Sequence, residues 1–99
     1  MGWADGYIES LARGETVAFR PRGNSMTPRI RSGELCTVEP LRDYVPSKGD
    51  VVLCRVGSAQ YLHLVKAFDG DRFQIGNNHG RVNGWVGLGA IYGRLVSVE

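Results

Sequence analysis

Frequent glycines divide this chain into short segments, and this spacing limits the structures that the chain can form. Glycine accounts for 14 of the 99 residues, about twice the usual share of ~7%. It is common in tight turns because it has no Cβ and readily adopts a positive φ. The runs between turns are rich in apolar and β-branched residues, as in Val51-Val52-Leu53-Cys54-Arg55-Val56, a composition typical of strands. We therefore predict short β-strands connected by many turns.

A helix is expected at the N-terminal end. Trp3, Tyr7, Ile8 and Leu11 recur at helical spacing, and Gly14 follows where such a helix would stop. This short amphipathic helix could pack on the domain or dock on a partner. The sequence leaves open whether the protein forms a homodimer through this helix.

The rest of the chain predicts six or seven short strands. Their expected ranges are 16–22, 34–40, 51–56, 61–68, 72–75, a short apolar patch at 85–86, and 90–98. The dipeptide Asp69-Gly70 is a strong hairpin signal between two of them. We expect a mainly β fold, a small sheet roll or barrel-like domain with one short N-terminal helix. Residues 1–99 should form one domain, with the helix within 1–14 and the β core within 16–98.

The charge of the chain is small but unevenly distributed. A net charge of +2 does not by itself indicate a polyanion such as nucleic acid as partner. Four arginines nevertheless bracket position 25, and no acidic residue lies between Glu15 and Glu34. This basic bracket consists of Arg20, Arg22, Arg29 and Arg31. It is either a solvated loop surface or a site for an acidic peptide or nucleic acid.

Neither a membrane anchor nor a bound metal is indicated. No run of ~18 apolar residues occurs, and the N-terminus lacks a basic stretch followed by an apolar core, so we expect a cytoplasmic protein. Cys36 and Cys54 lack the close spacing of a redox or zinc motif and are expected to be small buried thiols. His63 and His79 do not complete a metal site with them. We expect no metal and no cofactor.

Ser25 and Lys66 are the best indication of function. Ser25 lies in a glycine-containing turn, and Lys66 follows 41 positions later in a strand-like run. Counting alternate positions, Lys66 shares one strand face with Leu62, Leu64 and Phe68. Desolvation can lower a lysine pKa by ~3–5 units from ~10.4, and a neutral amine can accept a serine proton. Separately, each residue also has an ordinary explanation, as a turn serine and as an edge-strand lysine that reaches water.

Five short blocks follow one another along the chain. They are Gly23-Asn24-Ser25-Met26-Thr27-Pro28, Lys48-Gly49-Asp50-Val51-Val52, Leu64-Val65-Lys66, Ile75-Gly76-Asn77-Asn78 and Ile91-Tyr92-Gly93-Arg94-Leu95-Val96. In order and spacing they resemble the Ser-Lys peptidases, which include LexA-like SOS repressor proteases and bacterial signal peptidases. The resemblance covers about residues 19–96. It implies a mainly β catalytic domain in which a serine attacks a peptide carbonyl and a strand lysine is the general base.

The resemblance also assigns roles to individual residues. Ser25 matches the nucleophile and Lys66 the base, while the backbone N–H groups of Ser25 and Asn24 would form the oxyanion hole. The loop residues that would contact substrate are Gly23, Met26 and Pro28. The substrate would lie extended along a strand edge, with small side chains next to the cleaved bond.

Several departures from these families narrow the expected role. The repressors carry a helix-turn-helix domain and cut themselves at an Ala-Gly bond, whereas here about 15 residues precede the first expected strand and no Ala-Gly dipeptide occurs. Signal peptidases carry a membrane anchor and a Ser-Asp-Ser-Arg-like stretch where this chain has Asn78-His79-Gly80-Arg81. We therefore expect a Ser-Lys peptidase that cleaves a protein substrate in trans. The alternatives are a non-catalytic module that binds a peptide or nucleic acid, and a vestigial site.

Overall fold

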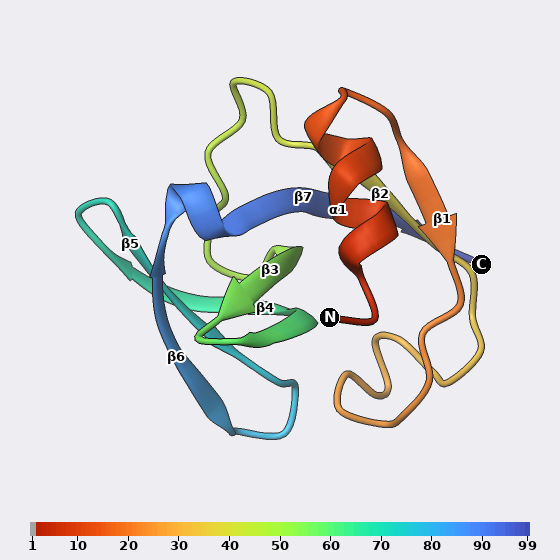
Figure 1. Cartoon of the computed structure of the whole chain (residues 1–99). Coiled ribbons are helices and arrows are strands. Elements are labelled where there is room, and N and C mark those ends of the chain that lie inside the picture. The colour runs from red at the N-terminus through yellow and green to blue at the C-terminus, as the bar shows by residue number, and fades with distance from the viewer. Residues whose placement is uncertain (1) are drawn as a thin grey trace.

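Seven strands form one antiparallel sheet, and a short helix packs against it (Figure 1). The computed structural model describes residues 2–99. The elements are α1 (Asp5–Ala12), β1 (Val17–Phe19), β2 (Cys36–Pro40), β3 (Val51–Val56), β4 (Ala59–Asp69), β5 (Arg72–Gly76), β6 (Val82–Gly87), the 3-10 turn η1 (Leu88–Ala90) and β7 (Ile91–Val98). The predicted mainly β fold with one short N-terminal helix is confirmed.

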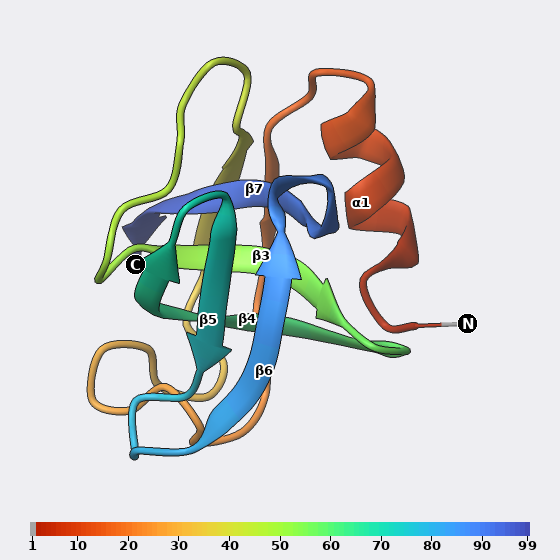
Figure 2. The ribbon, with the colours of Figure 1, turned by 90° about the vertical axis from the view of Figure 1, so that its left-hand side faces the viewer.

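The sheet is strongly curved. Its strand order is β1-β2-β7-β3-β4-β5-β6, so β1 and β6 are the two edges. Figure 2 shows β5 and β6 crossing the direction of β3 and β7 at a steep angle. Register shifts interrupt four of the six strand pairs, namely β2–β7, β3–β7, β4–β5 and β5–β6. Such bulges bend strands and increase their twist, which explains how a single sheet can roll up.

The curvature gives the central strand β3 two buried faces. Val51 and Leu53 belong to one core cluster, whereas Val52 and Cys54 belong to a second cluster on the opposite face. All four residues are therefore buried, and the segment is apolar without alternation. This is the reason why 51–56 was the most apolar predicted strand.

The helix α1 packs on the sheet, close to β1, β2 and β7. Leu11 is buried in the first core cluster, and Gly14 has a φ of 84° where the chain leaves the helix. The buried side chain of Gln60 ties the start of the helix to β4. Its Oε1 accepts a hydrogen bond from the Ala4 N–H at 2.8 Å, and its Nε2 donates to Asp5 Oδ1 at 2.6 Å. Within residues 2–99 no helix has the length and apolar character needed to cross a membrane.

The predicted alternation of β4 is wrong beyond Val65. Val65 pairs with Ile75 and Ala67 pairs with Gln74, so Lys66 is the extra residue of a β-bulge. A bulge shifts the inward and outward positions that follow it. Phe68 accordingly pairs with Phe73 of the second core cluster and not with the Leu64 side, and it is 61% exposed, while Lys66 is half-buried.

Candidate active site

Ser25 lies in the loop that connects β1 to β2, and core residues anchor this loop. Met26 and Ile30 are both buried in the first core cluster, and the Ile30 N–H donates to the Met26 carbonyl at 2.9 Å. Gly23 has a φ of 108°, a value that favours glycine, and its N–H donates to Ser32 Oγ at 3.1 Å. The loop therefore holds Ser25 in one place while its hydroxyl stays accessible.

The Ser25 hydroxyl meets a histidine. Ser25 Oγ lies 3.2 Å from His63 Nε2, and His63 Nδ1 lies 2.7 Å from Asn83 Oδ1. An amide oxygen only accepts hydrogen bonds, so Nδ1 carries the proton and Nε2 is left to accept the Ser25 proton. This is the arrangement of an activated nucleophile: a hydroxyl, a base within reach, and a third group that orients the base.

Two strands bring His63 and Asn83 together. His63 is in β4, and Asn83 is in β6, one strand further along the sheet beyond β5. Ile75 pairs with Gly84 and Gly76 pairs with Val82, so Asn83 is the extra residue of a bulge. A bulge redirects a side chain out of the regular pleat. Here the redirected amide reaches the imidazole.

The surroundings of His63 favour its neutral form. The side chain is buried at 8% exposure, and its ring stacks on Tyr61 with centroids 4.7 Å apart. Burial lowers the pKa of His63, the positive charges of Arg81 and Lys66 lower it further, and the hydrogen bond with Asn83 opposes them in part. Because the pKa lies below its ordinary value, the imidazole is uncharged at neutral pH and can accept a proton.

Lys66 has a different partner. Its Nζ donates to the carbonyl oxygen of Asn77 at 2.9 Å, and no hydrogen bond joins it to Ser25 among residues 2–99. The structure thus brings His63, and not the predicted Lys66, to the Ser25 hydroxyl. The stem of Lys66 lies beside Gly76, the register partner of Leu64, and its amine ends at the turn that follows β5.

The turn that Lys66 contacts holds the Ser25 loop. Asn78 donates its N–H to the Ser25 carbonyl at 2.9 Å and its Nδ2 to the Thr27 carbonyl at 3.0 Å. His79 Nε2 lies 3.0 Å from the carbonyl oxygen of Asn24. The residues at 76–81 are therefore a clamp on the loop, and Lys66 supports that clamp through its hydrogen bond to the Asn77 carbonyl.

The interior of this clamp is tight. The Asn77 side chain accepts the N–H groups of His79 and Arg81 at 2.8 and 2.9 Å. A Cβ on Gly76 would lie 2.3 Å from the Arg81 carbonyl oxygen and 2.4 Å from Lys66 Cδ. Glycine is required here because the backbone and the lysine stem leave no space for a side chain.

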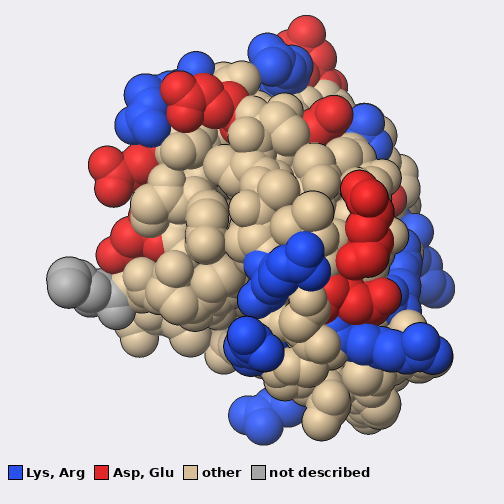
Figure 3. Space-filling model, turned by 90° about the vertical axis from the view of Figure 1, so that its right-hand side faces the viewer, with Lys and Arg blue, Asp and Glu red and all other residues tan. Residues whose placement is uncertain are grey.

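Two of the four arginines in the basic bracket donate hydrogen bonds from their side chains to backbone carbonyls. Arg20 donates to the Gly33 carbonyl at 3.0 Å and Arg29 to the Gly49 carbonyl at 2.7 Å. Figure 3 shows basic side chains gathered in the lower part of one face. Within residues 2–99 the single salt bridge joins Arg13 and Glu15, so no guanidinium of the bracket has a carboxylate oxygen within 4.0 Å.

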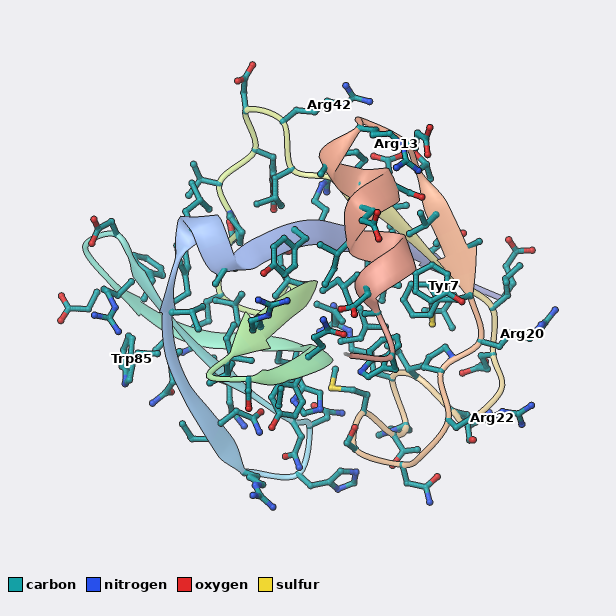
Figure 4. All side chains as sticks on the ribbon, viewed as in Figure 1. Tyr7, Arg13, Arg20, Arg22, Arg42 and Trp85 are labelled. Atoms are coloured by element: carbon teal, nitrogen blue, oxygen red, sulfur yellow. The ribbon has the colours of Figure 1, made fainter. Side chains whose placement is uncertain are left out.

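A pocket of about 670 Å³ opens beside the serine and the histidine. Asn83, Gly23 and Met26 also line it, so two of the three predicted substrate-contact residues border the pocket. Pro28 is not among the described residues that line it. Side chains of α1 and β1 contribute the far wall, where Figure 4 labels Tyr7, and Arg20 and Arg22 lie on the same side of the molecule.

Residues 4–79 match the family model described as Peptidase S24-like. The chain belongs to the peptidase S24-like family. The S24-like match spans Ser25, His63 and Lys66 and ends before Asn83. No significant match is found to a curated protein or to a solved structure. The resemblance to LexA-like and signal-peptidase-like proteins is thereby confirmed.

The backbone of this S24-like domain offers two free donors beside the serine. The N–H groups of Asn24 and Ser25 have no hydrogen-bond acceptor within residues 2–99. Both residues are exposed, so their N–H groups are open to solvent and would be accessible to an oxyanion formed at the serine. These are the same two groups that the sequence resemblance assigned to that role.

The two cysteines of this S24-like domain are buried and free, as expected for small core thiols. Burial raises the pKa of Cys54 to about 12, and burial with the nearby Glu34 charge raises that of Cys36. A raised pKa leaves little thiolate at neutral pH. Among residues 2–99, no three His, Cys, Asp or Glu side chains are grouped so that they could hold a metal ion.

Sequence reasoning missed His63 and Asn83. His63 was considered only as a metal ligand, although it lies three positions before Lys66 in the same predicted strand. The available signal was the residue type: histidine is the most frequent general base, and His63 follows Ser25 by 38 residues. No signal pointed to Asn83, because its orientation depends on a bulge between β5 and β6.

Proposed function

We propose that this S24-like domain is a serine peptidase in which Ser25 is the nucleophile and His63 the general base. The observation that supports this most directly is the hydrogen-bonded series from Ser25 Oγ through His63 to Asn83. The proposal keeps the nucleophile that the sequence predicted and replaces Lys66 by His63 as the base. A serine and a histidine oriented by an amide are sufficient parts for acyl transfer.

The reaction would begin with the attack of Ser25 Oγ on a peptide carbonyl carbon. The Oγ–C bond forms while the hydroxyl proton moves to His63 Nε2, and the carbonyl electron pair moves onto oxygen. The N–H groups of Asn24 and Ser25 would donate to that oxyanion, and such a donor typically contributes ~2.7–4 kcal/mol. The Asn83 amide oxygen would keep Nδ1–H in place as the imidazole becomes charged.

In the second half of the reaction, His63 passes on the proton that it took from Ser25. The imidazolium of His63 gives its Nε2 proton to the leaving amine as the C–N bond breaks, which leaves an acyl group on Ser25. Water then attacks the ester carbonyl carbon and loses a proton to Nε2; the bond from that carbon to Ser25 Oγ breaks, Nε2 returns the proton to Oγ, and the new carboxylic acid leaves. Substrate would come from another protein and reach the serine through the adjoining pocket.

Lys66 would act as a positioning residue. Its ammonium holds the Asn77 carbonyl, and the turn at 76–81 in turn holds the Ser25 loop. Its charge also contributes to the lowered pKa of His63. Loss of the lysine should therefore weaken the reaction without removing its base.

A fluorophosphonate probe tests the proposal, because it reacts with an activated serine regardless of the preferred peptide. Intact-mass analysis should show one adduct on the wild-type protein, none on Ser25→Ala, and labelling slower by ~10²–10⁴-fold on His63→Ala. A peptide mixture incubated with the wild-type protein should show new termini that Ser25→Ala does not produce. Normal labelling of His63→Ala together with unlabelled Lys66→Met would restore the lysine as base and reject the histidine.

A further inference from the structure

Aromatic residues in the lining of the serine pocket suggest which substrates this domain takes. Resting on the proposed peptidase function, we propose that the pocket selects peptides with a large apolar side chain within three residues of the cleaved bond, accompanied by an acidic residue. The apolar side chain would lie against an aromatic shelf formed by Trp3, Tyr7 and Phe19. This differs from the small side chains that the family resemblance implies.

The aromatic shelf is ordered by contacts between its own rings. Phe19 stacks on Tyr7 with centroids 4.5 Å apart, and Trp3 meets Phe19 edge-on at 5.6 Å. The indole N–H of Trp3 donates to the Gln60 carbonyl at 3.0 Å, which fixes the ring. Trp3 nevertheless remains 51% exposed. Phe19 is buried and Tyr7 half-buried, so the open part of the shelf is mainly the Trp3 ring, and an oriented aromatic ring that is open to solvent is suited to an apolar partner.

The shelf and the serine share one pocket. Ser25 and His63 line the same cavity of about 670 Å³ as the shelf, and apolar Leu62 and Met26 also belong to its lining. Pockets of ~300–1,000 Å³ accommodate ligands much larger than one methyl group. A peptide whose carbonyl reaches Ser25 therefore has space for a large side chain on the shelf.

The shelf depends on α1 being held in place. Trp3 and Tyr7 come from the helix and the turn before it, and the Gln60 side chain binds that turn through Ala4 and Asp5. In this chain the N-terminal helix thus supplies a wall of the substrate pocket, beyond covering the core.

Positively charged side chains also line this pocket. Arg20, Arg22 and Arg81 line the same pocket, and none has a carboxylate within 4.0 Å among residues 2–99. Figure 4 shows Arg20 and Arg22 extending outward from the loop after β1. Unpaired positive charges around a binding site attract acidic partners and disfavour basic ones. A peptide with an acidic residue beside its large apolar residue matches both features.

Cleavage-site profiling of a proteome-derived peptide mixture tests the inference. With the wild-type protein, Phe, Tyr, Leu or Met should be enriched about 10-fold over Ala at one position within three residues of the cut, with Asp or Glu enriched nearby. Trp3→Ala should lose the apolar enrichment. Trp85→Ala is the matched control, since Trp85 is another exposed tryptophan, at 42%, and lies outside this pocket. Enrichment of Ala, Gly or Ser, or an unchanged profile in Trp3→Ala, would overturn the inference.

The arginine part has its own pair of variants. Arg22→Gln should reduce the acidic enrichment, whereas Arg72→Gln, which changes an arginine outside the pocket, should retain it. If the acidic enrichment is lost in both variants, or in neither, the preference for an acidic residue is overturned.

A binding measurement separates this inference from the peptidase proposal. Fluorescein-labelled hexapeptides that contain Asp beside either Phe or Ala are titrated onto Ser25→Ala protein and followed by fluorescence polarisation. Tighter binding of the Phe peptide, lost when Trp3→Ala is added, supports the shelf even if the wild-type protein neither reacts with fluorophosphonate nor cleaves peptides. Equal binding of the two peptides rejects the shelf even if the serine is reactive.

Discussion

Ser25 in a surface loop and His63 in β4 form a hydrogen bond of 3.2 Å across 38 positions of sequence. Asn83 fixes the tautomer of that histidine, and burial lowers its pKa. The two residues thus have both the geometry and the protonation state that proton transfer requires. Lys66, the residue that sequence reasoning placed at this position, supports the neighbouring turn.

The pH dependence distinguishes the two bases. His63 must be neutral to accept the Ser25 proton, and its pKa is lowered mainly by burial. Activity should therefore rise with pH through a midpoint below the usual histidine value of ~6.5 and be constant from about neutral pH upward. The rate of fluorophosphonate labelling measured across this range checks the expectation. A rate that keeps rising into the alkaline range would point to an amine base.

Substitution of the two lysines isolates the role of Lys66. Lys66→Met should slow labelling by less than His63→Ala, because it removes support for the turn at 76–81 but leaves the base. Lys48→Met, which changes the chain's other lysine at an exposed position, is the control and should label at the wild-type rate. The midpoint of the pH profile should move upward in Lys66→Met, since one of the charges that lower the His63 pKa is removed.

Asn83 should affect the rate through His63. Asn83→Ala removes the acceptor for Nδ1–H, so labelling should slow by about 10-fold. This loss is smaller than the ~10²–10⁴-fold that the general base itself contributes. Asn83→Asp keeps an acceptor and adds a negative charge, which raises the pKa of His63. Its pH profile should shift upward while its plateau rate recovers toward wild type. Equal behaviour of the two variants would argue against orientation by this side chain.

Gly76→Ala should destabilise both the fold and the site. The new methyl group would meet the Arg81 carbonyl and the Lys66 stem, and overpacking of this kind costs about 1–3 kcal/mol of unfolding free energy. Gly6→Ala is the control, because it lies in α1 with nothing within 4 Å of the added Cβ, and it should stabilise by ~0.5–1 kcal/mol. Urea unfolding followed by tryptophan fluorescence measures both changes.

The cysteines should not react in the folded protein. Both are buried, and the pKa of Cys54 is raised to about 12. An aromatic disulfide reagent at neutral pH should therefore detect no thiol in the native state and 2 after denaturation, the number in the sequence. Rapid reaction of one thiol in native buffer would contradict the burial of that residue.

Local patterns predicted the fold because they depend on neighbouring residues. Turn dipeptides and apolar runs located the strands, and helical spacing located α1, since each pattern reflects the geometry of one segment. The strand at 51–56 was found with its observed bounds. The predicted face of Phe68 was wrong because nothing local signals a bulge, which is a mismatch between two strands and not a property of either one.

Sequence patterns were enough to predict a mainly β domain, which the S24-like family match and the sheet confirm, and to place Ser25 in a loop between two strands. The folded chain shows the contacts of the site, in which His63 meets Ser25, Asn83 orients His63, and Trp3 and Phe19 share a pocket with them. No local pattern encodes these contacts, because they join strands and loops that lie far apart in the chain. Their geometry depends on sheet curvature and on bulges, which arise only when the strands pair.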